Sequence, residues 1–570
     1  MKKILILLLS VLLLVSMLAA CGDGGDTDTS EQTNDPADDG GDVNAAEASL
    51  GLRYAVLTEP TEDAAGTCAL AGIGDCEDFD IIVPRYNEEG YEVVQLGEQA
   101  FMDLNYITSV QLPTSIASIG LQAFSGCTSL QTVTIPDGVS ELAEGLFTNC
   151  TSLEEIELPS SINAIGNSVF AGCSSLEEIE LPRRINLIGN SAFLNCENLS
   201  EIIFPNYTRT INLGAMVFGG CTSLTELELP STVRDIPENA FRGCTGLTSV
   251  TLSEDVSSIG DSAFAECSNL ETVNIPVGIT EIGSSTFYNC YSLSTLEIPS
   301  TVTTVGPAAF AGCESLTNFA LPNSVTTLGE AAFMGCTALR NFTLSEQVTS
   351  IPQYAFLGCI ELVSIKIPAS ATAIGAMAFN GCTNLETVVI NDGVTEIGRM
   401  AFSSCENLVY VKTGDALTKV GDMAFASCSS LIYVNLGTAC KTIGNNAFVS
   451  CVALETFVGA PETIGENAFD RCNALKDFYY TGNISSLSAL VSSKISNYNS
   501  VLENKWIISS KTTPADMADV TVGEDGAYTK TTVLNLTNNG VAYTKDLVYR
   551  FYFVDADGFY TVWEAPEVTD

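Results

Sequence analysis

A phenylalanine recurs every 23 residues through most of this chain, inside the pattern Ile-Gly-x-x-Ala-Phe-x-x-Cys-x-x-Leu. The stretch 119–136 is a complete example, with Phe124, Cys127 and Leu130 at its centre. A fixed period of roughly 20 to 50 residues is the signature of a solenoid, in which each coil buries its apolar side only against its neighbours. The seventeen members of the series are Phe101, Phe124, Phe147, Phe170, Phe193, Phe218, Phe241, Phe264, Phe287, Phe310, Phe333, Phe356, Phe379, Phe402, Phe425, Phe448 and Phe469.

Each coil is predicted to contain one short strand, centred nine residues after the phenylalanine. In the example, Val133 and Ile135 point inward, whereas Thr132 and Thr134 point outward, because side chains alternate along a strand. Proline very often follows, and a strand end tolerates its missing amide donor. Strands that pair in parallel from coil to coil are expected to form one long sheet.

The pattern resembles the BspA-like leucine-rich repeats of bacterial surface proteins, and the resemblance covers about residues 91–483. It implies a β-rich solenoid, a right-handed leucine-rich repeat array of 23-residue coils whose parallel sheet lies on the concave side. Members of that family are mostly implicated in adhesion or in the recognition of host and other surfaces. The resemblance therefore implies a binding role.

The departures from the pattern are informative. The coil between Phe193 and Phe218 has 25 residues, so two extra residues should bulge at 206–210. The glycine of the Ile-Gly pair is replaced by proline at 237 and 352 and by alanine at 143. Because proline fixes φ near −65°, this position does not need a positive φ. Glycine is expected there because neighbouring coils approach closely.

The N-terminal segment is predicted to target the chain to a membrane. Residues 1–20 have a basic start, a short apolar run and small final residues, as in a secretory signal peptide. Leu18-Ala19-Ala20-Cys21 resembles a bacterial lipobox, which implies cleavage before Cys21 and lipidation of that residue. An ordinary signal peptide with a coincidental cysteine is the alternative. Residues 21–50 are predicted to be a disordered acidic tether, since 22–50 hold nine acidic residues and no Lys or Arg.

The remaining boundaries follow from where the repeat begins and ends. Residues 51–100 are predicted to be an N-terminal cap, in which Cys68 and Cys76 form either a disulfide or two buried thiols. The solenoid spans 101–483, a cap or linker spans 484–504, and a small antiparallel β-sandwich domain spans 505–570. In that last domain Asp555-x-Asp557-Gly558 is interpreted as a hairpin turn, because Pro566 stands where a calcium loop needs glutamate.

Composition excludes several classes of function. The chain has 23 Lys and Arg against 69 Asp and Glu, a net charge of −46, which disfavours nucleic acid binding. It has no histidine, so His-based nucleophile pairs, His-ligated zinc and His acid–base catalysis are excluded. We therefore expect no enzymatic activity and no cofactor.

Sixteen of the twenty cysteines lie three residues after a repeat phenylalanine. A ladder of thiols cannot converge on one metal ion, and the parallel direction of its side chains is wrong for disulfides. We expect small buried residues that pack beside the phenylalanines. They are Cys127, Cys150, Cys173, Cys196, Cys221, Cys244, Cys267, Cys290, Cys313, Cys336, Cys359, Cys382, Cys405, Cys428, Cys451 and Cys472.

The outward strand positions are the candidate binding surface, because their side chains are free of the core. One group, the tyrosine zone, combines aromatic rings with a cation: Tyr410, Lys412 and Tyr433. The other group, the glutamate zone, suggests a basic partner or a divalent cation, or is simply a solvated acidic face. It consists of Glu155, Glu157, Glu178, Glu180, Glu226 and Glu228.

Together these features predict a monomeric, adhesin-like lipoprotein on the extracellular face of a bacterial envelope. It would bind an extracellular protein or glycan through the concave face of the repeats. The alternative is a structural or scaffolding surface protein without a specific ligand. An enzyme is less favoured, because repeats of this kind supply a groove rather than a pocket.

Overall fold

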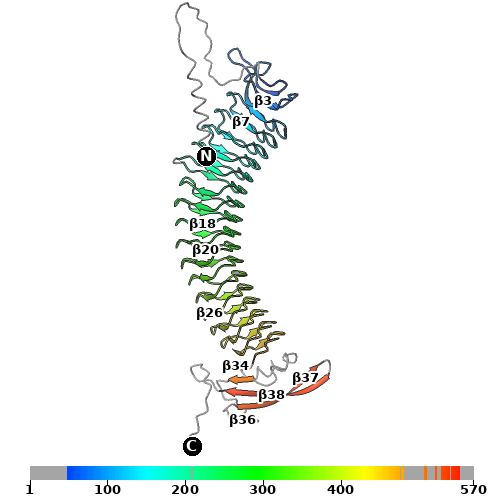
Figure 1. The fold of residues 1–570 in the computed structure, drawn as a ribbon, viewed down its shortest axis with the longest axis vertical. Coiled ribbons are helices and arrows are strands. Elements are labelled where there is room, and N and C mark those ends of the chain that lie inside the picture. The colour runs from blue at the N-terminus through cyan, green and yellow to red at the C-terminus, as the bar shows by residue number, and fades with distance from the viewer. Residues whose placement is uncertain are drawn as a thin grey trace, which may run out of the picture. The chain divides into compact units, whose positions relative to one another are not determined.

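The computed structural model describes residues 48–206, 209–475, 477–480, 506–509, 520–522, 528–538 and 541–552. The signal peptide, Cys21, most of the acidic tether, the linker 484–504 and the Asp555–Gly558 turn lie outside these residues. Within the described ranges, no helix is long and apolar enough to span a membrane. The described chain forms a solenoid of stacked coils (Figure 1).

Four strands precede the regular coils and start the stack. An antiparallel pair, β1 (Arg53–Thr58) and β2 (Thr67–Gly72), is followed by β3 (Asp80–Ile82) and β4 (Glu92–Leu96). The first coil has two strands, β5 (Ser109–Gln111) and β6 (Ser118–Ile119). Strand β3 pairs in parallel with β5, and β4 pairs in parallel with β6. The predicted cap therefore continues the sheets of the solenoid.

The predicted strand occurs in most coils and forms the first row of parallel strands. Its outward side chains are called the strand face below. Thr132 and Thr134 are exposed and Val133 is buried, as predicted. The members are β5 (Ser109–Gln111), β7 (Thr132–Thr134), β10 (Glu178–Glu180), β12 (Glu201–Ile203), β14 (Glu226–Glu228), β16 (Ser249–Thr251), β18 (Thr272–Val273), β21 (Asn318–Ala320), β23 (Asn341–Thr343), β24 (Ser364–Ile367), β26 (Thr387–Ile390), β28 (Tyr410–Lys412), β30 (Tyr433–Asn435), β32 (Thr456–Gly459) and β34 (Asp477–Tyr480).

A second row of two-residue strands was not predicted. Each of these strands ends at the apolar residue that precedes the glycine of the Ile-Gly pair. The side chain of that apolar residue points into the core. They are β6 (Ser118–Ile119), β8 (Glu141–Leu142), β9 (Ala164–Ile165), β11 (Leu187–Ile188), β13 (Asn212–Leu213), β15 (Asp235–Ile236), β17 (Ser258–Ile259), β19 (Glu281–Ile282), β20 (Thr304–Val305), β22 (Thr327–Leu328), β25 (Ala373–Ile374), β27 (Glu396–Ile397), β29 (Lys419–Val420), β31 (Thr442–Ile443) and β33 (Thr463–Ile464).

The prediction of one uninterrupted sheet is corrected by the pairing. The first row divides into the groups β3–β5–β7, β10–β12, β14–β16–β18 and a long group that begins at β21. The break between β12 and β14 falls at the coil with two extra residues, and the other two breaks fall where the segments 153–159 and 293–299 form no strand. Beyond β21 pairing runs without a break through β34, although the coil between Phe448 and Phe469 has only 21 residues.

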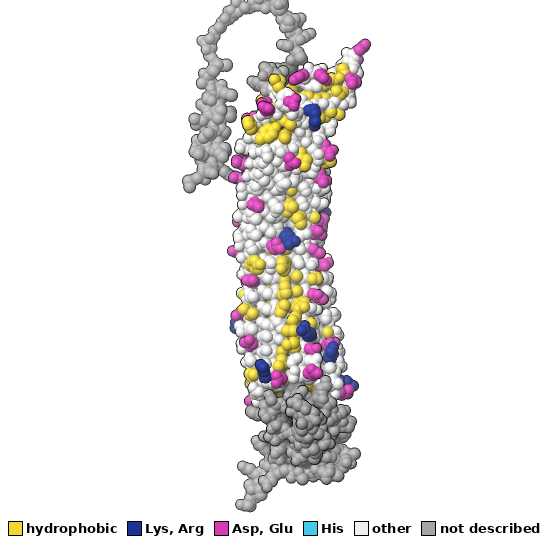
Figure 2. Space-filling view, turned by 90° about the vertical axis from the view of Figure 1, so that its right-hand side faces the viewer, with side chains coloured by type: hydrophobic (Ala, Val, Ile, Leu, Met, Phe, Trp, Pro, Cys, Tyr) yellow, Lys and Arg dark blue, Asp and Glu magenta, His cyan; other side chains and the backbone are white. Residues whose placement is uncertain are grey.

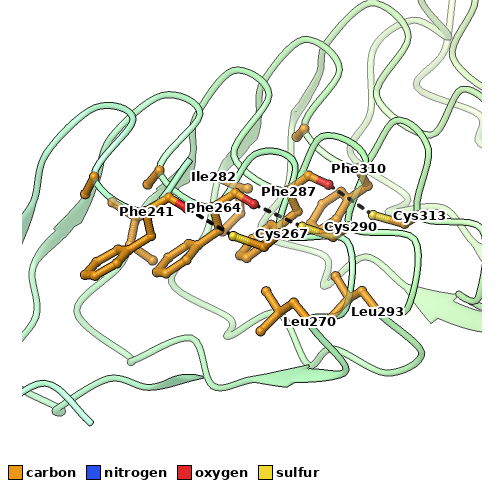
Figure 3. Close-up of a cluster of buried hydrophobic side chains, with 14 of the residues drawn as sticks. Phe241, Phe264, Cys267, Leu270, Ile282, Phe287, Cys290, Leu293, Phe310 and Cys313 are labelled. Atoms are coloured by element: carbon orange, nitrogen blue, oxygen red, sulfur yellow. Dashed lines mark hydrogen bonds between the residues drawn. The ribbon is translucent and has the colours of Figure 1, made fainter. Parts of the chain in front are cut away.

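The seventeen phenylalanines form one continuous stack inside the coils. Neighbouring ring centroids lie 5.1–5.8 Å apart. Figure 3 shows this stack at Phe241, Phe264, Phe287 and Phe310, with leucines beneath it. All seventeen rings are buried, so the stack is the centre of the hydrophobic core.

The cysteine ladder is buried and reduced, as predicted. Each ladder thiol donates a hydrogen bond to the carbonyl oxygen of the phenylalanine in the preceding coil, at Sγ···O distances of 3.0–3.3 Å (Figure 3). Cys68 and Cys76 are also free and buried, which decides between the two alternatives left open by the sequence. Each of these carbonyl oxygens also accepts the backbone N–H of the residue three positions later in its own coil, so the thiol adds a second hydrogen bond that joins successive coils.

The glycine of the Ile-Gly pair is needed for close approach, as predicted. A Cβ atom on Gly398 would lie 2.6 Å from the carbonyl carbon of Gly375 in the preceding coil. None of these glycines has a positive φ, which agrees with the proline found at two equivalent positions. Small residues here let the backbones of successive coils pack against each other.

Four strands are described beyond the solenoid: β35 (Trp506–Ser509), β36 (Val520–Val522), β37 (Tyr528–Asn538) and β38 (Val541–Tyr552). Strands β36, β37 and β38 are antiparallel, whereas β35 pairs in parallel with both β34 and β38. All four extend the sheet of the last coils. A second, facing sheet is not seen among the described residues, so the sandwich stays a prediction.

Candidate functional site

The glutamate zone is exposed but does not form one continuous array. Glu155 and Glu157 lie in a segment, 153–159, that forms no strand. Glu178 and Glu180 lie on β10, which pairs only with β12, so that Glu178 is beside Glu201. Glu226 and Glu228 lie on β14, which pairs with β16 and is separated from β12 by the break in the row; their neighbours are Ser249 and Thr251.

The carboxylates of this zone do not converge. Among the described residues there is no group of three or more Asp, Glu, Cys or His side chains that could hold a metal ion. None of the six glutamates forms an ion pair with another residue that the structure describes. Figure 2 shows acidic side chains scattered along the length of the face that it presents. These observations favour the interpretation of the zone as a solvated acidic surface.

The tyrosine zone is assembled by continuous strand pairing. Strands β26, β28 and β30 pair in parallel, which places Tyr410 between Thr387 and Tyr433, and Lys412 between Val389 and Asn435. The two tyrosine rings stack with centroids 4.9 Å apart and an interplanar angle of 6°. Three residues chosen from the sequence therefore form a single cluster.

The two tyrosines differ in their surroundings. Tyr410 is 44% exposed, whereas Tyr433 is only partly exposed. Burial raises the pKa of the Tyr433 hydroxyl, the neighbouring Tyr410 raises it further, and a hydrogen bond with Asn435 lowers it. Tyr433 is thus the partly buried ring on which Tyr410 stacks. The face of the Tyr410 ring that points away from Tyr433 stays uncovered.

A hollow of about 350 Å³ opens beside Tyr410 on the strand face. Its volume lies at the lower end of the range of roughly 300–1,000 Å³ found for small-molecule sites. Val389, one of its lining residues, is 54% exposed. Its walls are formed by two neighbouring coils, through Thr387, Val388, Val389, Ile390, Asn391, Asp392, Tyr410, Lys412, Thr413 and Gly414.

The hollow exists because one coil carries small residues where other coils are bulky. Thr413 and Gly414 occupy the positions that hold Ile135 and Pro136 in the coil of Phe124. A Cβ atom on Gly414 would collide with Asp392, so glycine lets the neighbouring carboxylate lie against this coil. The strand end is thereby left open where a proline ring would otherwise fill it.

The sequence carries a sign of this opening. Proline is absent from the strand end in every coil from that of Phe379 onward, where Asn391, Gly414, Gly437, Ala460 and Thr481 stand, and serine replaces it at 253 and 345. The tyrosine zone lies at the start of this run of coils. A missing proline therefore accompanies the hollow but does not locate it alone.

The comparisons with known proteins agree with this architecture. The family model described as the BspA type leucine rich repeat region (six copies) matches residues 94–216, 208–316, 303–430 and 372–499. The chain belongs to the BspA-type leucine-rich repeat family. Both zones lie within the matched repeats. No curated protein matches the chain.

The chain is also similar to solved protein structures. A leucine-rich repeat protein from Bacteroides ovatus superposes with a TM-score of 0.50 at 24% identity, over 75% of this chain and 98% of that one. A leucine rich cell surface protein from Faecalibacterium prausnitzii has a TM-score of 0.37 at 23% identity, over 78% and 98%. The pneumococcal vaccine antigen PcpA has a TM-score of 0.31 at 18% identity, over 81% and 93%.

Proposed function

We propose that this chain is a cell-surface interaction lipoprotein that binds an extracellular protein or glycan through the strand face. It acts without catalysis or a cofactor, as a monomer held to the bacterial envelope by a lipid on Cys21. The β-sandwich predicted for residues 505–570 would follow the repeats in the same surface protein. Membership of the BspA-type repeat family and the lipobox-like tetrad at 18–21 support this role.

The observation that carries the proposal is the tyrosine zone with its hollow. Exposed aromatic side chains with polar tips are enriched in binding interfaces, and Tyr410 is held rigidly by stacking on Tyr433. A rigid surface loses little conformational entropy when a partner binds. The glutamate zone, by contrast, brings together no group of three side chains that could hold a metal ion among the described residues.

A binding screen tests the proposed role. Soluble protein comprising residues 22–570 would be immobilised and probed with extracellular-matrix proteins, mucins and glycans by surface plasmon resonance. We expect saturable binding that falls by about tenfold or more when Tyr410 and Tyr433 are both replaced by alanine. Tyr291→Ala is the matched control, because Tyr291 is similarly exposed but lies outside the zone.

The same screen separates the competing interpretations. Charge reversal of Glu155, Glu157, Glu178 and Glu180 should leave binding unchanged, and a large loss would restore the glutamate zone as the site. If the folded protein binds no partner in the screen, the scaffolding alternative gains support.

The anchor is tested separately. Replacement of Cys21 by alanine should release the protein from membranes, because it removes the residue that would carry the lipid. Retention of the variant in the membrane fraction would contradict the lipobox interpretation.

A further inference from the structure

The ring of Tyr410 has one uncovered face. Tyr433 covers the other face, and the neighbour on the open side is Thr387, whose short side chain cannot cover an aromatic ring. The hollow lies on this side, next to the exposed Val389. The structure therefore offers a flat apolar platform beside an open hollow.

Lys412, at the rim of the same hollow, is distinguished by the absence of an ion pair. The other three lysines described in the solenoid pair with glutamates at 2.7–3.3 Å: Lys366 with Glu346, Lys419 with Glu396 and Lys441 with Glu462. Among the described residues, Lys412 has no such partner within 4.0 Å. In a chain with a net charge of −46, a cation without a carboxylate partner is positioned for an anion from outside.

The opposite wall of the hollow accepts hydrogen bonds. Asp392 contributes a carboxylate, and Asn391 donates its amide group to the carbonyl oxygen of Ile367 at 2.6 Å, which leaves its own oxygen as an acceptor. A ligand that fits must therefore have an apolar face for Tyr410, an anionic group for Lys412 and hydrogen-bond donors for the far wall. Because Asp392 is itself negatively charged, the hollow disfavours a ligand that also places negative charge beside it.

We propose that this hollow binds a sugar ring that carries a carboxylate, as part of an acidic glycan. The C–H face of a pyranose ring stacks on an aromatic ring, its carboxylate pairs with Lys412, and its hydroxyl groups donate to Asp392 and Asn391. A peptide strand is disfavoured, because the backbone groups of β26, β28 and β30 already pair with one another. This inference rests on the proposed function and narrows its ligand class.

Uronic acids of polysaccharides and sialic acids of mucins share this chemistry, so both are tested. Soluble protein comprising residues 22–570 would be titrated by isothermal calorimetry with a glucuronate-containing oligosaccharide, with sialyllactose and with neutral lactose. We expect at least one acidic probe to bind and lactose to bind about tenfold more weakly or not at all. Which acidic probe binds identifies the source of the sugar.

Two variants and their matched controls assign the contacts. Lys412→Gln should weaken the acidic probe about tenfold and reduce the salt dependence of binding, whereas Lys419→Gln should leave both unchanged. Tyr410→Ala should abolish binding, whereas Tyr291→Ala should not. Far-UV circular dichroism and thermal unfolding would confirm that each variant is folded.

Three results would overturn the proposal: no binding of either acidic probe by folded protein, equal binding of lactose, or unchanged affinity in Lys412→Gln. If a protein partner still binds and depends on Tyr410 while no sugar binds, the inference fails and the proposed function stands. If neither sugars nor proteins bind, both fail.

Discussion

Two pairs of stacked aromatic rings lie in the same two coils, one inside and one outside. Phe402 and Phe425 stack at 5.3 Å with an interplanar angle of 7°, and Tyr410 and Tyr433 stack at 4.9 Å and 6°. The phenylalanines are fully buried, whereas Tyr410 is 44% exposed. The near-identical geometry is a consequence of coil spacing, so stacking alone does not indicate function.

The difference lies in how far each stack extends. The phenylalanine stack runs through all seventeen coils, because every coil needs the same apolar filling. The tyrosine stack occupies two coils, beside the hollow. A residue required by the repeat recurs at every period, whereas a residue that serves a local purpose interrupts it. Perturbation of the phenylalanine stack should therefore reduce stability far more than perturbation of the tyrosine stack.

The largest effect is expected from alkaline pH, which acts on the interior. Burial raises the pKa of the thiols of Cys127, Cys196, Cys244, Cys290 and Cys382 from 9.0 to about 12. The folded chain keeps these protons while the unfolded chain releases them above pH 9. Each thiol therefore stabilises the fold fully below pH 9, and this contribution is lost progressively as the pH rises from 9 towards 12. Urea unfolding followed by circular dichroism, with reductant present, should show a steep loss in this window.

A variant with fewer titrating thiols checks this cause. In Cys244→Ser/Cys290→Ser the hydroxyl groups do not titrate below pH 12, so the slope of stability against pH should be shallower. An unchanged slope would show that other groups control alkaline unfolding.

Truncation of one interior ring comes next in magnitude. Phe402→Ala should destabilise the fold by about 3–5 kcal/mol, because it leaves a cavity between Phe379 and Phe425. Phe402→Leu, which retains most of the volume, should cost less than about 1.5 kcal/mol. Equal losses in the two variants, measured by urea unfolding, would argue against cavity formation as the cause.

The close approach of coils predicts a smaller effect. Gly398→Ala should cost about 1–3 kcal/mol, because the new methyl group meets the backbone of Gly375 and Ala376. The reverse change, Ala143→Gly, at the equivalent position of another coil, should cost no more than about 1 kcal/mol. Thermal unfolding of both variants tests this asymmetry, and a neutral Gly398→Ala would contradict it.

The smallest effect on stability is expected outside. Tyr433→Ala should cost only about 0.2–1 kcal/mol, as for other cross-strand pairs on a sheet surface. A double-mutant cycle with Tyr410→Ala measures the pairing by urea unfolding. A loss as large as that of Phe402→Ala would mean that the tyrosines are part of the core.

Much of the fold follows from the sequence, because a ladder position has the same environment in every coil. The burial of Phe124, Cys127 and Leu130 and the need for glycine between coils could be predicted from one period. The second row of strands could not be predicted, because a strand of two residues is too short to show an alternation of apolar and polar side chains. The breaks in the first row could not be predicted either. They depend on how the strands of successive coils align, and the repeat length does not give that alignment.

The candidate site was predictable only in part. Outward positions placed Tyr410, Lys412 and Tyr433 on adjacent strands, and the structure brings them together. Outward position alone also selected the glutamate zone, because it does not show where the pairing of the strands breaks. The hollow depends on the small residues Thr413 and Gly414. Their effect becomes clear only when the structure places them beside Tyr410.

The reactivity of the ladder thiols would also report where neighbouring coils separate. Each sulfur is covered by the carbonyl group of the preceding coil, so it becomes reactive when those two coils separate. An alkylating reagent would mark every separated coil permanently, and peptide mass spectrometry would show which coils were marked first. Because stability in a repeat array is the sum of local and neighbour contributions, the order of marking would map where the stack begins to come apart.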